Sequence, residues 1–130
     1  MSRHVFAFLV VFIGGGLGSM LRHALNQLSA AFLGPDFPYG TLSVNIIGSL
    51  AMGLIAGWVA LRGGGGQMLL LFLTTGILGG FTTFSAFSLD AALLWERGQA
   101  ARALFYVLGS VIPAIVAIFF GLAVVRAWLR

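Results

Sequence analysis

The stretch that decides the fold is GGFTTFSAF (residues 79–87), which lies inside a long apolar run otherwise suited to crossing a membrane. Its paired glycines and hydroxyl side chains are expected to interrupt an ordinary spanning helix. In the hydrocarbon core of a bilayer, backbone groups without partners are tolerated only where protein buries them or where they line a cavity. The interruption predicted at 79–83 is therefore a candidate functional site.

The composition around this stretch is that of a membrane protein. Only 8% of the 130 residues are charged and 60% are hydrophobic, which is unusual for a soluble domain. A spanning helix needs ~20 mostly apolar residues, so the chain has room for about four helices and no further domain. We predict a single all-α membrane domain, 1–130, whose four transmembrane helices lie roughly at 5–31, 41–62, 67–96 and 103–126. The third helix is expected to be broken in mid-membrane, and self-association is favoured over a monomeric bundle.

The first predicted helix begins with Arg3 and a short apolar core, which resembles a signal peptide. The remainder would still be a membrane protein, so a first span is the better interpretation. Gly14, Gly18 and Arg22 recur at intervals of four and share one helical face, a pattern that lets helices approach closely. Two interpretations of Arg22 remain open: an arginine anchoring the membrane boundary, or a cation at the mouth of a pore.

The second predicted helix carries a polar and small-residue stripe with a period of four. Its members are Thr41, which is also a candidate N-cap, Asn45, Ser49, Gly53 and Gly57. Asn45 is either an interhelical hydrogen-bonding residue or a donor that lines a pathway.

The charges indicate membrane boundaries and exclude other classes of function. The basic residues besides histidine are seven scattered arginines, so no cluster for nucleic acid is present. No nucleophile–base pair or metal-ligand cluster is apparent, so the chain is not expected to be an enzyme. Four arginines fall on the side of the termini and three on the other side, which is almost no positive-inside bias. Insertion in both orientations, with opposite copies pairing, is therefore a hypothesis.

Three segments together resemble the Fluc/CrcB family of fluoride channels: GGGLGSMLR (14–22), YGTLSVN (39–45) and GGFTTFSAF (79–87). The resemblance covers essentially the whole chain. It implies a multi-pass protein of the bacterial plasma (inner) membrane that forms an antiparallel dual-topology homodimer. It also implies two anion pathways and a structural sodium ion at the dimer interface, with fluoride leaving the cytoplasm passively.

The resemblance also assigns roles to individual residues. The implied anion-pathway residues are Asn45, Phe84, Phe87, Ser110 and Arg22, together with Thr41 of the polar stripe. The implied sodium ligands are the backbone carbonyls of Gly79 and Thr82. The family commonly has a second hydroxyl residue where this chain has Ala86. Any role of that hydroxyl is absent here or is taken by Ser85 or Ser88.

The chemistry of these residues suits a small, strongly hydrated anion. Hydrogen-bond donors replace its water, and the positive edges of phenyl rings contact it without trapping it. No basic residue is expected at mid-depth, where it would bind the anion tightly. A proton-coupled cation or drug exporter of four helices is the alternative, but it needs an embedded carboxylate, for which Asp90 is the only candidate. A third alternative is a non-transporting scaffold, in which the polar stripe of the second helix serves only packing.

Overall fold

The computed structural model describes residues 1–130, which form helices joined by turns at 34–38, 63–66 and 97–99. The helices in chain order are α1 (Arg3–Leu33), α2 (Tyr39–Arg62), α3 (Gln67–Leu71), the π-helix η1 (Phe72–Leu78), α4 (Gly79–Phe81), α5 (Ser85–Glu96) and α6 (Ala100–Trp128). The elements from α3 to α5 follow one another as a third span. Four segments are therefore long and apolar enough to cross a membrane.

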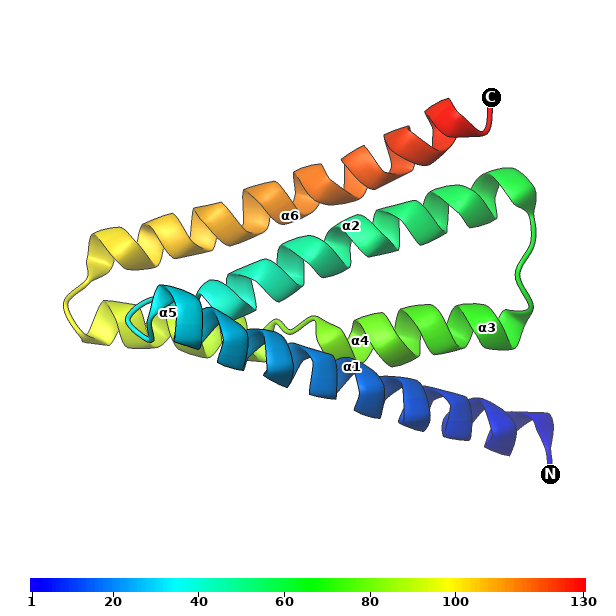
Figure 1. Cartoon of the computed structure of the whole chain (residues 1–130), viewed down its shortest axis with the longest axis horizontal. Coiled ribbons are helices and arrows are strands. Elements are labelled where there is room, and N and C mark those ends of the chain that lie inside the picture. The colour runs from blue at the N-terminus through cyan, green and yellow to red at the C-terminus, as the bar shows by residue number, and fades with distance from the viewer.

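The spans pack as two pairs. α2 lies along α6 in the most extensive contact of the molecule, and α1 lies along η1 and α4. The pairs converge at the end that carries the turns at 34–38 and 97–99, and they diverge toward the end that carries both termini (Figure 1). The third span packs mainly on α1 and also contacts α2 and α6.

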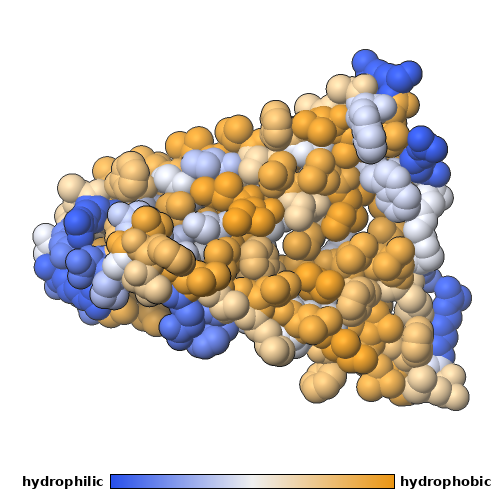
Figure 2. Space-filling view, in the orientation of Figure 1, coloured by the Kyte–Doolittle hydropathy of each residue, from blue (hydrophilic) through white to orange (hydrophobic).

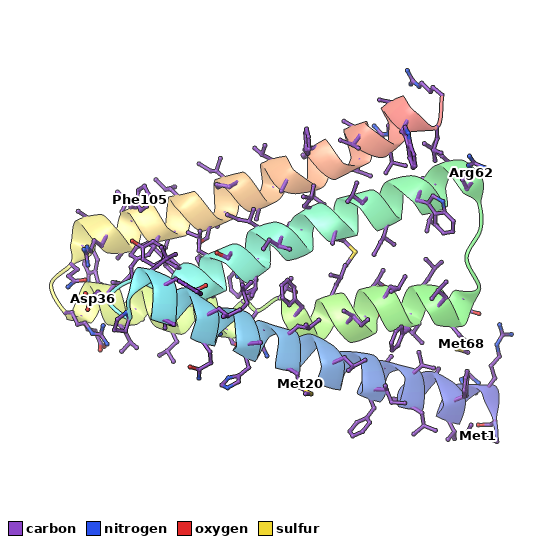
Figure 3. All side chains as sticks on the ribbon, in the orientation of Figure 1. Met1, Met20, Asp36, Arg62, Met68 and Phe105 are labelled. Atoms are coloured by element: carbon purple, nitrogen blue, oxygen red, sulfur yellow. The ribbon has the colours of Figure 1, made fainter.

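The surface of the molecule is suited to lipid. Only 17 of the 130 residues are buried, so most apolar side chains point outward. Hydrophobic residues cover the middle of the molecule and hydrophilic residues gather at its two ends (Figure 2). Arg62 lies at the end that carries the termini and Asp36 at the opposite end (Figure 3). A small buried cluster joins α5 to α6 near the narrow end and consists of Phe87, Leu94, Ala103 and Tyr106.

Glycines allow the close approach of α1 to the third span. A Cβ atom on Gly14 would lie 2.9 Å from the Gly76 Cα atom, and one on Gly18 would overlap the Ile77 carbonyl oxygen. Such small residues are typical of membrane helix interfaces, where backbones pack directly against each other. The predicted packing role of Gly14 and Gly18 is confirmed by these contacts.

The start of α2 differs from the prediction. Thr41 is not the N-cap residue; Pro38 is, and Thr41 is the third residue of the helix, with an exposed fraction of 7%. The φ of Pro38 is −79°, close to the value that its ring imposes and that suits a helix start. The helix therefore begins three residues earlier than an N-cap at Thr41 would indicate.

The interruption of the third span also lies partly elsewhere than predicted. Gly79 and Gly80 remain helical in α4, and the non-helical residues are 82–84, where Thr82 is extended with ψ 159°. The predicted interruption, 79–83, is therefore confirmed at residues 82 and 83 and wrong at residues 79–81. The physical reason is that Gly80 serves helix packing: a Cβ atom there would overlap the Gly15 carbonyl oxygen of α1.

Candidate functional site

A cavity of about 320 Å³ lies beside the interruption, between α2, the third span and α6. It brings together four of the predicted pathway residues and one predicted sodium ligand: Asn45, Phe84, Phe87, Ser110 and Thr82. The other lining residues are Gly48, Ser49, Met52, Leu78, Thr83, Val111, Ala114 and Ile118. The walls are therefore mostly apolar, with a few hydroxyl and amide groups, which is typical of a binding site for a small molecule or ion.

Asn45 holds the interruption in place. Its Nδ2 atom donates to the Thr83 carbonyl oxygen at 2.9 Å, and its Oδ1 atom accepts from the Thr83 N–H at 2.8 Å. In a continuous helix, that N–H would bond to the carbonyl of Gly79. The side chain of Asn45 thus satisfies both backbone groups of Thr83, and one N–H of its amide remains for another acceptor.

Phe84 and Phe87 lie side by side but in different surroundings. Their ring centroids are 5.6 Å apart at an interplanar angle of 47°. Phe84 is 77% exposed, whereas Phe87 is only 8% exposed and packs on the ring of Tyr106 at 5.3 Å. Phe87 is therefore fixed by the protein interior, while the Phe84 ring has no such support within one chain.

Ser110 supplies a hydroxyl group from α6. Its exposed fraction is 4%, and its Oγ atom is buried without a hydrogen-bond partner. A buried hydroxyl left unpaired costs free energy, about 1–3 kcal/mol. Ser110 thus points to a ligand or a water molecule in the cavity that it lines.

Three of the predicted site residues do not line this cavity. Thr41 lies toward the narrow end, in a second cavity of about 210 Å³ beside Asn26 and the turn at 34–38. Gly79 and Arg22 are also absent from the lining. The predicted set is therefore divided between the cavity and its surroundings.

Arg22 lies close to the interruption, and both interpretations of its role stay open. It lies within α1, about 16 Å along the axis from the end of that helix at Leu33. Its Nη1 atom is 3.4 Å from the Thr82 carbonyl oxygen, so the guanidinium group lies at the level of the interruption. The expectation that no basic residue lies at mid-depth stays a prediction.

A polar contact between α5 and α6 was not predicted from the sequence. The Tyr106 hydroxyl donates to Asp90 Oδ2 at 3.0 Å, and Tyr106 is completely buried. Tyr106 also makes an edge-to-face contact with Phe37, with centroids 5.5 Å apart. A signal was present in the sequence, because an acidic residue inside a span needs a partner, and the partner is this tyrosine.

Comparison with known proteins gives the family. A family model described as CrcB-like protein, Camphor Resistance (CrcB), matches residues 9–122. A protein of Rhodopseudomonas palustris (strain BisB5) named fluoride-specific ion channel FluC is 61% identical over 92% of this chain and 97% of its own length. Proteins of the same name from Methylobacterium nodulans and Paracoccus denitrificans are 63% and 60% identical over 91% and 92% of this chain, and over 94% of their own lengths in both cases. With four spanning helices and these relatives, the chain belongs to the CrcB family of ion channels, as a multi-pass protein of the bacterial inner membrane and not an enzyme.

Proposed function

We propose that this protein is a fluoride-specific channel that lowers cytoplasmic fluoride by passive efflux. The relatives named fluoride-specific ion channel FluC support the choice of ion. The observation that carries the proposal is the cavity at the interruption, which contains Asn45, Phe84, Phe87 and Ser110 together. These residues come from α2, α5, α6 and the interruption itself, so the fold is needed to assemble them.

The cavity offers the chemistry that fluoride needs. The unpaired hydroxyl of Ser110 and the free amide N–H of Asn45 replace part of the hydration shell of the ion. The edges of the Phe84 and Phe87 rings are positive and contact the anion weakly enough for it to leave. Arg22 does not line the cavity, and it raises the local anion concentration from a distance without forming a deep trap.

A structural sodium ion, not transported, fits the backbone at the interruption. The carbonyl of Gly79 lacks the Thr83 N–H that would pair with it in a helix, because that N–H is donated to Asn45. The Thr82 carbonyl accepts only the long contact from Arg22 at 3.4 Å. Neutral oxygen atoms of this kind suit a hard monovalent cation, as they do at broken helices of transporters. The ion would hold the backbone of the interruption open, and both Gly79 and Thr82 would be its ligands.

The functional unit in this proposal is an antiparallel homodimer with one pathway per protomer. Within one chain the Phe84 ring is 77% exposed on an apolar surface, and the cavity is open beside it. A second copy inserted in the opposite orientation closes this side and brings two more carbonyls toward the same cation. A single chain offers only two of the oxygen ligands, so the pairing and the sodium site depend on each other.

The test is fluoride efflux from liposomes that contain the purified protein, recorded with a fluoride electrode. We expect fluoride efflux without comparable chloride efflux, and a loss of flux in Phe84→Ala and Phe87→Ala. Replacement of sodium by a large organic cation should lower both the flux and the dimer fraction. Chloride efflux at a similar rate, or no fluoride efflux in sodium buffer, would refute the proposal.

The alternative, a proton-coupled exporter, has less support. It requires a carboxylate that exchanges protons with the transported cation. Asp90 is the acid within the spans, but it is bonded to the Tyr106 hydroxyl and is absent from the lining of the cavity. A cation uptake that follows an imposed pH gradient in the same liposomes would favour this alternative.

A further inference from the structure

An aromatic groove lies at the narrow end of the molecule, away from the cavity. It has a volume of about 310 Å³ and is lined by Phe37, Tyr39, Ala101, Arg102 and Phe105. It runs between the turn at 34–38 and the first turns of α6. Phe105 and Asp36 mark this end of the molecule in Figure 3.

The groove is built on a rigid base. The Phe37 ring is 4.8 Å from that of Tyr39 and 6.2 Å from that of Phe105. On its inner side Phe37 contacts the completely buried Tyr106 at 5.5 Å. Phe37 is therefore held from within the chain, while the Tyr39 and Phe105 rings contact Phe37 and are 37% and 68% exposed.

The groove faces the bilayer and not the cavity. Phe105 precedes Ser110 by five residues, which places the two side chains about 140° apart around α6. Leu108 and Ile112 follow Phe105 on its own face and are 48% and 55% exposed. An apolar track thus leads from the groove toward the middle of the membrane.

The charge at the groove is positive. Arg102 is exposed at its rim, and the first turn of α6 contains no acidic residue. Asp36, on the neighbouring turn, is not among the lining residues. Because α2 and α6 both begin here, the arginine lies at a membrane boundary, where aromatic and basic side chains meet lipid headgroups.

We propose that this groove binds one anionic phospholipid per chain, with its phosphate on Arg102 and one acyl chain on Phe105 and the apolar track below it. The lipid headgroup supplies an anionic partner for Arg102, which has none within the protein. The acyl chain covers an apolar surface that the fold leaves open. This inference does not depend on which ion the protein conducts.

The test is lipid binding by the full-length protein, measured by native mass spectrometry with phosphatidylglycerol and phosphatidylcholine of identical acyl chains. We expect one phosphatidylglycerol per chain to be retained in preference to phosphatidylcholine. Arg102→Gln should reduce this preference about fivefold, since one arginine near a membrane contributes about that much to anionic lipid binding. Phe105→Ala should weaken the binding of both lipids alike.

Arg130→Gln is the matched control, because Arg130 is an exposed arginine at the other end of the molecule. It should keep the preference for phosphatidylglycerol over phosphatidylcholine. An equal loss in both arginine variants, or no loss in Arg102→Gln, would overturn the proposal. Displacement of the lipid by inorganic phosphate would also overturn it, since a simple anion site needs no acyl chain.

Discussion

Asn45 is the residue on which both the interruption and the proposed pathway depend. Asn45→Ala leaves the N–H and carbonyl of Thr83 without their present partners, at a cost of about 1–3 kcal/mol each. We expect a clearly lower unfolding temperature of the purified protein and no fluoride flux. Asn45→Asp keeps an acceptor for the Thr83 N–H but replaces the donor to the Thr83 carbonyl with a carboxylate oxygen, so it should restore neither stability nor flux.

Ser49→Ala is the control for these variants, because Ser49 lines the same cavity one turn further along α2. It should change the unfolding temperature much less than Asn45→Ala does. An unfolding temperature of Asn45→Ala equal to that of the wild type would contradict the role of Asn45 in holding Thr83.

Substitution of Ser110 should affect the stability of the protein and its fluoride flux in different ways. Its hydroxyl is buried and unpaired, so Ser110→Ala should leave the free energy of unfolding unchanged or raise it by up to ~1 kcal/mol. The same change removes a donor to the anion and should reduce fluoride flux by roughly tenfold or more. Ser110→Thr keeps the hydroxyl and should retain most of the flux. Full flux in Ser110→Ala would remove Ser110 from the pathway.

At the scale of helices, the sequence predicts the spans well and the interruption less well. Apolar length and the glycines at 34, 63–66 and 98 are local signals, and they indicate where the helices end. The position of the interruption depends instead on Asn45, which is 38 residues from Thr83 in the sequence. Gly80 of the motif packs against α1, so its local tendency to break a helix is overridden. A contact between residues so far apart in the chain produces no periodic pattern, so it cannot be recognised in a single sequence.

The glycines of α1 differ in their surroundings: Gly18 packs against the third span, and Gly16 does not. Gly18→Ala would place a Cβ atom against the Ile77 carbonyl, and the shift that this requires should cost about 1–3 kcal/mol. Gly16→Ala is the matched control, since a Cβ atom at Gly16 meets nothing within 4 Å. It should stabilise the helix by up to ~1 kcal/mol, the usual difference in helix propensity. Unfolding in detergent, followed by circular dichroism, measures both. Equal effects of the two substitutions would contradict the close packing of α1 on the third span.

At the scale of the whole molecule, the structure changes the number of arginines counted at each end of the spans, which determines the orientation of the chain in the membrane. Arg22 reaches the Thr82 carbonyl from within α1, so it is not a charge at the end of a span. The balance is then four arginines on the side of the termini (Arg3, Arg62, Arg126 and Arg130) against two on the other side (Arg97 and Arg102). Arginine is favoured on the cytoplasmic side. We therefore expect the proposed insertion in both orientations to show a residual preference for cytoplasmic termini.

Paired reporters at the C-terminus, one active inside the cell and one active outside, test this expectation. We expect signal from both, with the inside reporter stronger. Ala31→Arg adds a charge at the exposed end of α1 and should bring the two signals closer together. Ala127→Arg adds one at the exposed end of α6 and should drive them apart. Signal from one reporter alone, unchanged by either substitution, would rule out the two orientations that the antiparallel dimer requires.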